Sequence, residues 1–204
     1  MLSKHDNIVI HHCHKLGDIS ALLSSNAVLF FDDCLFSQYV FLKKNIVKLQ
    51  TAGIQCVLGF SANIYRRDDA AKPIAEADSS VLHDRVHAGD MNALDGFMSV
   101  NEVKELVKLS NVYIACHGYD HLDLEHSRMS NVQQLAAFNR DVTLAHQAME
   151  KLGLSTSMFV YPYDYACYGA KAALKKHGYE IVWPEEGHER TYIEELIPSG
   201  GSNA

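Results

Sequence analysis

Six short apolar runs, separated by segments with helical periodicity, constrain the fold of this 204-residue chain more than any other feature. Their residues are apolar in succession rather than alternately, as in strands covered on both faces of a parallel sheet. The runs are NIVI (7–10), AVLFF (27–31), IQCVLGF (54–60), VYIAC (112–116), SMFVY (157–161) and EIVW (180–183). Strands that alternate with helices form right-handed βαβ units, so the sequence predicts an α/β fold with a mainly parallel sheet. An open doubly wound sheet and a closed barrel both fit this pattern.

Four of the intervening segments are expected to be helical. Each has either an apolar stripe at helical spacing or a capping box at its start. They lie over 36–51, after a capping box at 99–102, from a capping box at 130–133 to Gly153, and over about 168–177. The stretch 61–98 has only a weak pattern and is expected to be a long loop, a kind of segment that often carries function.

Composition and charge exclude several classes of protein. Apolar residues make up 48% of the chain and charged residues 21%, which is typical of a folded domain rather than a disordered one. The formal net charge of −7 argues against a surface for nucleic acid or anionic membranes. No apolar run reaches the ~18 residues of a membrane span. We expect a single domain over residues 1–197 and a flexible tail over 198–204.

The cysteines and the N-terminus indicate the compartment. Five cysteines are scattered through the chain without a CxxC pair, which fits neither a disulfide framework nor a zinc knuckle. The first residues lack the pattern of a signal peptide. A reduced, cytoplasmic protein is therefore expected.

Polar residues follow three of the apolar runs at the point where each run ends. Asp32 and Asp33 follow the second run, the segment from His117 to His121 follows the fourth, and Pro162-Tyr163-Asp164 follows the fifth. Ligands of α/β sheets and barrels bind beyond the carboxyl ends of the strands, so these residues are expected to meet at one edge.

Histidine spacing alone is weak evidence for a metal site, because about 0.7 His–His pairs at i,i+4 are expected by chance in a chain with 12 histidines. The pair His83/His87 lies in the weakly patterned stretch and is expected to be solvated. The pair His117/His121 follows a buried strand directly, and one helical turn there would place both rings on one face, as two zinc ligands require.

An Asp-Asp pair at a strand end is by itself more often a helix-capping turn than a site. Together with His117 and His121, Asp32 and Asp33 supply one carboxylate ligand and one spare carboxylate. Two histidines and one carboxylate leave open positions on a metal, which is typical of catalytic rather than structural sites.

The residues at these strand ends resemble a known family. Phe31-Asp32-Asp33, His117-Gly-Tyr-Asp-His121-Leu-Asp-Leu and Phe159-Val-Tyr-Pro162-Tyr163 are similar to successive motifs of the polysaccharide deacetylases, the NodB-homology carbohydrate esterases. The family motifs read TFDDG, H-S/T-x-x-H-P-x-L and F-x-x-P-Y-G, and one branch reads F-x-Y-P-Y-G. The resemblance covers about residues 27–184. It implies a distorted, mainly parallel (β/α) barrel, seven-stranded and TIM-like, and a metal-dependent hydrolase that removes an acetyl group from a sugar or glycan precursor.

The resemblance also implies roles for individual residues. Asp33, His117 and His121 would bind a divalent metal, with zinc expected first and cobalt, nickel or manganese as alternatives. Asp32 would be the general base, and the backbone N–H of Tyr163 would help to hold the oxyanion. The same motif would bring Pro162 and Tyr161 to the substrate. An N-acetyl group is expected before an O-acetyl group.

The chain departs from the family pattern at several positions. Cys34 and Asp164 stand where the motifs have glycine, and Val160 stands where many members have an arginine that orients the base. The late Leu-x-His motif, the source of the general acid, has no match after His188. The acid is therefore open among six histidines, namely His11, His12, His14, His83, His87 and His188.

Two alternatives to a deacetylase follow from these departures. The chain could be a carbohydrate- or metal-binding protein that has lost catalysis, or a metal hydrolase that attacks another small C–N bond, such as that of a cyclic amide. Aromatic residues near the strand ends are equally open to two interpretations. Trp183, Tyr161, Tyr163 and Tyr165 could form a wall for sugar stacking, although Trp183 is expected to fill the core.

Overall fold

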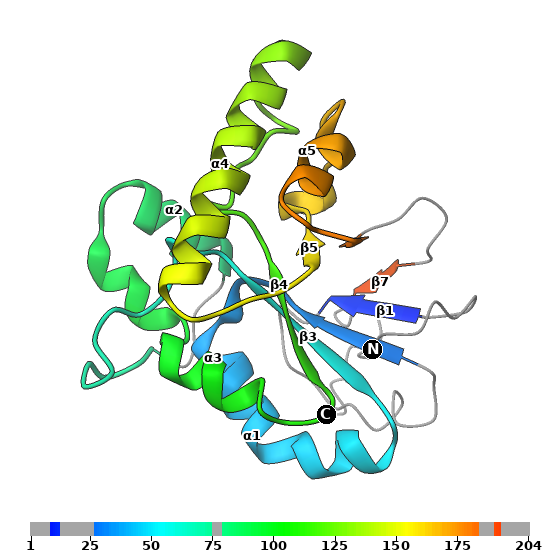
Figure 1. Ribbon diagram of the computed structural model, residues 1–204. Helices are drawn as coiled ribbons and strands as arrows, with labels where there is room; N and C mark the ends of the chain where they lie inside the picture. The colour runs from blue at the N-terminus through cyan, green and yellow to red at the C-terminus, as the bar shows by residue number, and fades with distance from the viewer. Residues whose placement is uncertain (1–8, 13–26, 75–78, 184–189, 193–204) are drawn as a thin grey trace, which may run out of the picture.

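The computed structural model of the protein describes residues 9–12, 27–74, 79–183 and 190–192. Seven strands form one sheet in which every neighbouring pair is parallel, in the order β6-β5-β4-β3-β2-β1-β7 (Figure 1). The strands are β1 (Val9–His12), β2 (Ala27–Phe31), β3 (Gln55–Phe60), β4 (Val112–Cys116), β5 (Met158–Val160), β6 (Ile181–Trp183) and β7 (Arg190–Tyr192). The parallel α/β architecture expected from the apolar runs is confirmed.

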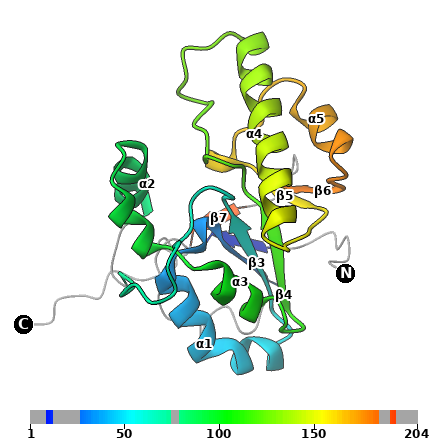
Figure 2. The same cartoon turned by 60° about the vertical axis from the view of Figure 1, so that its left-hand side comes forward.

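The described residues also form five α-helices and three short 3-10 helices. They are α1 (Phe36–Thr51), α2 (Ser79–His87), α3 (Val100–Leu106), α4 (Asn131–Lys151) and α5 (Ala170–Lys176), with the short 3-10 helices η1 (Asp32–Cys34), η2 (Met91–Gly96) and η3 (Pro162–Asp164). Figure 2 shows α1 and α3 together at one end and α4 and α5 together at the other. Among the described residues, no helix combines the length and the apolar character that a membrane crossing requires.

Two expectations about the elements need correction. The stretch 61–98 is not one long loop, because it contains α2 and η2. The strand β7 lies beyond the last apolar run and was not expected from the sequence. The four predicted helices and six predicted strands are present, although residues 7 and 8 of the first run lie outside the described residues.

The sheet is curled, but a closed barrel is not seen. Strands β6 and β7 form its two edges, and no backbone pairing joins them within the described part of the chain. The predicted closure of a seven-stranded barrel is therefore not confirmed, whereas its curled parallel sheet is. The predicted tail, 198–204, lies outside the described residues.

Alternating residues of the strands pack into two separate clusters. Residues such as Leu29 and Phe31 of β2 face the helices and belong to the main core. Their neighbours face the inner side of the curled sheet, where the buried side chains are Val28, Phe30, Val57, Ala115, Met158 and Val160. Since side chains alternate along a strand, continuing this inner row past the strand ends leads to Asp32 and His117.

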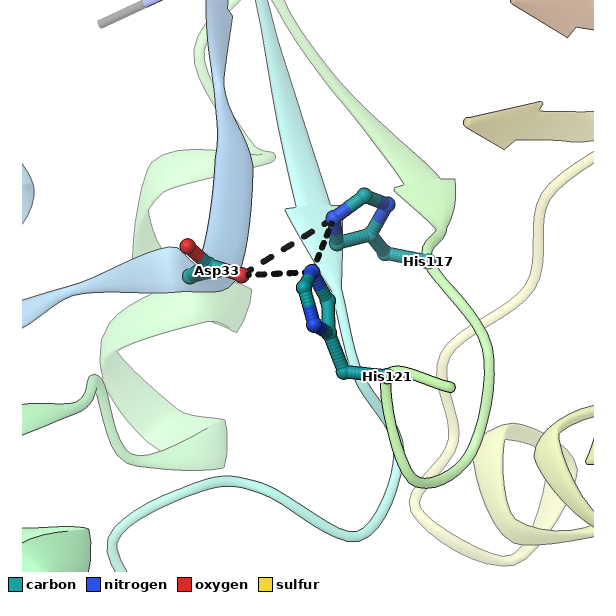
Figure 3. Close-up of side chains that lie close together, drawn as sticks. All are labelled: Asp33, His117 and His121. Carbon is teal, nitrogen blue, oxygen red and sulfur yellow. Dashed lines mark hydrogen bonds and ion pairs between the residues drawn. The ribbon is translucent and has the colours of Figure 1, made fainter. Parts of the chain in front are cut away.

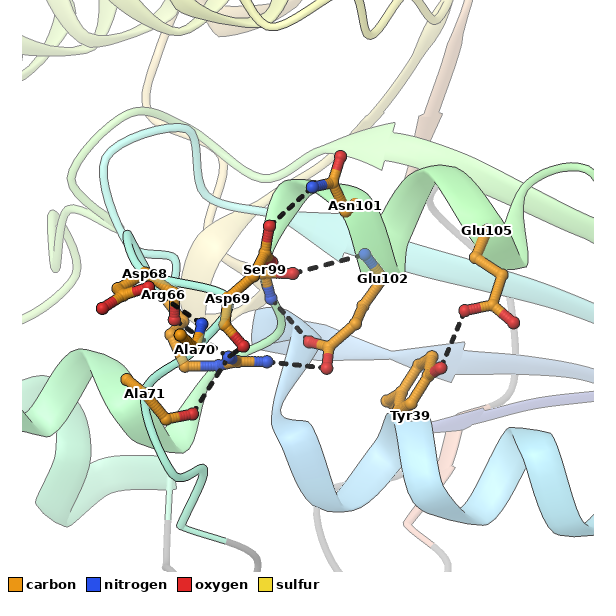
Figure 4. A network of polar contacts seen from close by, with 10 residues as sticks. All are labelled: Tyr39, Arg66, Asp68, Asp69, Ala70, Ala71, Ser99, Asn101, Glu102 and Glu105. Carbon is orange, nitrogen blue, oxygen red and sulfur yellow. Dashed lines mark hydrogen bonds and ion pairs between the residues drawn. The ribbon is translucent and has the colours of Figure 1, made fainter.

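A buried arginine fixes the segment that follows β3. The Nη1 atom of Arg66 donates hydrogen bonds to the carbonyl oxygens of Asp68 at 3.0 Å and Asp69 at 3.2 Å, and its Nη2 atom pairs with Glu102 at 2.6 Å (Figure 4). Glu102 also accepts a hydrogen bond from the backbone N–H of Ser99, which completes the predicted capping box of α3. The first part of the stretch 61–98 is thereby tied to α3.

Candidate metal centre

The Asp32-Asp33 pair lies on a tight turn directly after β2. Asp33 and Cys34 both have positive φ values, 72° and 52°, in the left-handed region that non-glycine residues rarely adopt. The buried side chain of Gln38 holds this turn, since its Nε2 donates to the Asp32 carbonyl at 2.7 Å and its Oε1 accepts from the Leu35 N–H at 2.8 Å. Both Asp32 and Asp33 are buried at this turn.

The segment between His117 and His121 is held in place by a side chain of α4. The buried Asp141 carboxylate accepts hydrogen bonds from the backbone N–H groups of Tyr119 and Asp120, both at 2.9 Å. Gly118 has a φ of 85°, and a Cβ atom there would lie 2.6 Å from Asp141 Oδ2. Only glycine fits both the conformation and the space, so the chain can turn sharply enough to bring His121 back towards His117.

Three predicted ligand atoms converge at the carboxyl edge of the sheet (Figure 3). Asp33 Oδ1 lies 3.2 Å from His121 Nε2 and 3.8 Å from His117 Nε2, and the two Nε2 atoms are 3.1 Å apart. All three side chains are buried. A set of one carboxylate oxygen and two imidazole nitrogens at this spacing fits a divalent cation such as zinc.

A second contact orients one of these imidazoles. His117 Nδ1 lies 3.0 Å from the carbonyl oxygen of Val160, and a carbonyl can only accept, so Nδ1 carries the proton. The lone pair of Nε2 then points towards Asp33 and His121. Metal-binding histidines are commonly fixed by such a hydrogen bond from their other ring nitrogen.

The electrostatics of the cluster favour the protonation states that metal binding requires. Burial alone would raise the pKa of Asp33, but the neighbouring His83, His121 and His117 hold it well below its ordinary value. Burial lowers the pKa of His121 to about 3, against the attraction of Asp33. The carboxylate is therefore ionised and His121 neutral near pH 7, as metal ligands must be.

The carboxylate of Asp32, the other member of the Asp-Asp pair, lies close to His117. A Cβ atom on Gly59 of β3 would meet Asp32 Oδ1 at 3.4 Å and His117 Cγ at 3.3 Å. The absence of a side chain at this strand position therefore allows Asp32 and His117 to approach each other across β3. Within the described residues, the candidate ligand group consists of Asp33, His117 and His121 and does not include Asp32.

The residues of the Pro162-Tyr163 motif occupy different environments. Tyr163, in η3, has a φ of 54°, and its half-exposed ring lies 4.8 Å from that of His121. Pro162 is buried. Tyr161 is buried as well, with its ring packed against Phe138 and Phe159. Their roles in holding the oxyanion and the substrate stay predictions.

Three positions at which the chain departs from the family motifs are among the described residues. Burial, together with the carboxylates of Asp33 and Asp32, raises the pKa of the Cys34 thiol well above its ordinary value, so it is a neutral thiol rather than a thiolate. Val160 contributes its carbonyl group to His117. Asp164 has a φ of 55°, a conformation that explains why other sequences would place glycine there.

One residue of the centre was assigned to the wrong environment by the sequence. His83 was expected to be solvated, yet it is buried on α2, with Nε2 only 2.9 Å from Asp33 Oδ1. Its partner in the i,i+4 pair, His87, is exposed as expected. The other candidate acids are outside the residues whose side chains are described; they are His11, His12, His14 and His188. The side chain of Trp183 is also outside this set, so its predicted place in the core is not tested.

Sequence comparisons give no match, since neither a protein-family model nor a curated protein matches the chain. Comparison with solved structures does. IcaB from Ammonifex degensii is 15% identical over 86% of this chain and 82% of its own, with a TM-score of 0.57. The de-N-acetylase from Aggregatibacter actinomycetemcomitans is 13% identical over 91% and 92% of the two chains, with a TM-score of 0.57.

A third similar structure is the Streptococcus pyogenes deacetylase PplD in complex with acetate. It is 12% identical over 85% of this chain and 80% of its own, with a TM-score of 0.52. The matches cover most of the chain and show that it has the polysaccharide deacetylase fold, as the motifs at the strand ends predict.

Proposed function

We propose that this protein is a metal-dependent hydrolase that removes an acetyl group, an N-acetyl group in the first instance, from a sugar or glycan. The observation that carries the proposal is the buried cluster of Asp33, His117 and His121 beside a second carboxylate, Asp32, on a deacetylase fold. Two of the similar structures are named a de-N-acetylase and a deacetylase with acetate, which supports the reaction class.

Asp33, His117 and His121 would hold the divalent metal. Their donor set of one oxygen and two nitrogens leaves room for further ligands, as catalytic sites do. When bound, the metal would polarise the acetyl carbonyl and lower the pKa of a water molecule towards ~7. Zinc is the proposed ion, and cobalt, nickel and manganese are the alternatives.

Asp32 is the proposed general base. Its carboxylate lies near Asp33 and His117, so it is placed to accept a proton from the attacking water. Asp33 cannot take this role while its charge serves the cation. The two adjacent aspartates would thus divide ligation and proton transfer between them.

The other steps need a donor for the oxyanion and a proton for the leaving amine. We assign the first to the backbone N–H of Tyr163, since the ring of this residue lies against that of His121, beside the metal centre. The amine must leave protonated, which requires a general acid. The sequence leaves this acid open among His11, His12, His14, His83, His87 and His188.

Acetate release is the direct test. Purified protein loaded with zinc or cobalt is incubated with N-acetylglucosamine oligomers, N-acetylated nucleotide sugars and acetyl esters, and acetate is measured. We expect turnover that depends on the metal and is lost in Asp32→Asn. Protein that binds metal but releases no acetate from any of these substrates would contradict the proposal.

A binding protein is the second candidate, because the chain has no Leu-x-His motif to supply the acid after His188. Sugar binding in calorimetry without acetate release would support it. Ring opening of a small cyclic amide without acetate release would instead support a hydrolase of another C–N bond.

A further inference from the structure

His83 is a fourth polar side chain at the centre, contributed by an element outside the three motifs. Its Nε2 atom is 2.9 Å from Asp33 Oδ1, closer than the Nε2 atoms of His121 at 3.2 Å and His117 at 3.8 Å. Its ring stacks on that of His121, with centroids 4.3 Å apart and an interplanar angle of 20°. His83 therefore contacts two of the three ligand residues at once.

The position of His83 is set by the packing of α2. Leu82 is buried in a small apolar cluster with Leu94 and Phe97, and Val86 packs against the same cluster one turn later. A Cβ atom on Gly96 would lie 2.4 Å from Leu82 Cδ1, so α2 sits directly on the backbone of η2. The Phe97 ring also meets His83 edge-on, with centroids 5.3 Å apart.

Burial of this imidazole needs a compensating partner, because a polar group loses its hydration when it is buried. The side chain of His83 is only 5% exposed, and the polar group that it meets at short distance is the Asp33 carboxylate, whose side chain is 3% exposed. The rings of His83 and His121 are nearly parallel and 4.3 Å apart, so their Nε2 lone pairs cannot converge on the same ion. The Nε2 atom of His83 lies instead at ion-pair distance, 2.9 Å, from the Oδ1 atom of the Asp33 carboxylate.

We propose that His83 is a positioning residue of the metal centre, which holds Asp33 in its metal-binding orientation through Nε2–H and supports the ring of His121 by stacking. The inference rests on the metal site of the proposed function but not on acetyl hydrolysis. Carboxylate ligands are commonly held by such partners, and their loss typically lowers metal affinity by about 10–100-fold.

Two substitutions separate the hydrogen bond from the packing. His83→Phe keeps a ring against His121 and Phe97 but removes the donor, whereas His83→Gln keeps an N–H donor and removes the ring. The matched control is His87→Ala, since His87 is an exposed histidine one turn along the same helix. Melting temperature and circular dichroism of each metal-free variant verify that it is folded.

The measurement is the Kd for Zn²⁺, obtained by competition with a chromophoric chelator on metal-free full-length protein. We expect His83→Phe to raise the Kd by about 10–100-fold, His83→Gln to remain closer to wild type, and His87→Ala to equal wild type. The Co²⁺ absorption spectrum of saturated His83→Phe should keep the wild-type bands, because the three ligands are unchanged.

Two results would overturn the inference. A folded His83→Phe protein with the wild-type Kd would show that Asp33 needs no such partner. A changed Co²⁺ spectrum in His83→Phe would show that His83 is itself a ligand. Failure of the proposed function gives different results from these. Unchanged metal content in His117→Ala would show that these residues do not form a metal site. Tight metal binding without acetate release would contradict only the deacetylase reaction.

Discussion

Asp32 and Asp33 are neighbours in the sequence with different surroundings. Asp32 continues the inner row of β2, whereas Asp33 turns away in a left-handed conformation and faces three histidines. We therefore expect Asp32→Asn to retain its metal and lose about 10²–10⁴-fold in turnover, because an amide cannot accept the proton of the attacking water. Asp33→Asn should bind metal weakly, because it loses the charged ligand.

Metal content after dialysis and acetate release with and without added zinc check this pair. Excess zinc should restore part of the activity of Asp33→Asn and none of that of Asp32→Asn. Metal loss in Asp32→Asn with retention in Asp33→Asn would reverse the two roles. If neither substitution changes metal binding or activity, the pair is a turn without catalytic function.

Cys34 illustrates how the environment changes the chemistry of a side chain. It directly follows the ligand Asp33, but burial and two carboxylates raise the pKa of its thiol. Since the thiolate is the reactive form, we expect native protein to resist alkylation at Cys34 by iodoacetamide at pH 8, and unfolded protein to react fully. Peptide mass spectrometry measures both. Rapid modification of Cys34 in the folded protein would contradict the assigned neutral thiol.

The segment from His117 to His121 shows how one element places the ligands carried by another. Asp141 of α4 accepts two backbone N–H groups from it. In Asp141→Asn one acceptor oxygen is replaced by an NH₂ group, which cannot accept. Hydrogen bonds to charged groups contribute about 1.5–3 kcal/mol, so we expect a loss of that order in the free energy of unfolding and weaker zinc binding.

Urea unfolding of metal-free protein and zinc competition measure the two effects. Asn139→Ala, on the same helix, is a suitable control, since the Asn139 side chain donates its hydrogen bond to the Leu135 carbonyl of α4 itself. Wild-type zinc affinity in a destabilised Asp141→Asn protein would show that the segment keeps its shape without this anchor.

Elements differ in how far the sequence predicts them. Helix α1 has its predicted bounds, because its stripe buries Leu42 and Leu49 against the main core. Helix α2 was not predictable in this way, since its nine residues bury Leu82 in a separate small cluster whose other members come from before and after the helix in the sequence. His83 was misjudged for the same reason: its i,i+4 pattern matches that of the ligand pair, and only the packing of α2 brings it to Asp33.

At the scale of the whole molecule, the parallel sheet determines where the site can be. Because β2, β3 and β4 are adjacent and parallel, their carboxyl ends bring Asp32, Asp33 and His117 to one edge, which the sequence predicts. Closure of the sheet is a different matter. Closure would require pairing between β6 and β7, which are short strands at opposite edges of the sheet. No local sequence pattern predicts whether two such strands pair.

The buried centre also links the stability of the whole molecule to pH. The pKa of His121 falls from 6.5 to about 3 on folding, mainly because burial disfavours the charged ring. Between these two values the unfolded chain binds a proton that the folded protein does not. The free energy of unfolding must therefore rise with pH through this window, by about 1.4 kcal/mol per pH unit, and the effect of His121 must level off above pH 6.5.

The contribution of His121 is isolated by comparing metal-free wild type with His121→Gln, which cannot take up this proton. Urea unfolding at pH 7.5, 6.5, 5.5 and 4.5 should show a wild-type advantage that is constant at the two higher values and shrinks at the two lower ones. Asp33, whose pKa is held low, adds to the loss only below its unfolded value of 3.8, outside this range. A difference between the two proteins that stays constant down to pH 4.5 would mean that His121 takes up its proton equally easily in both states, and that the centre is open to water.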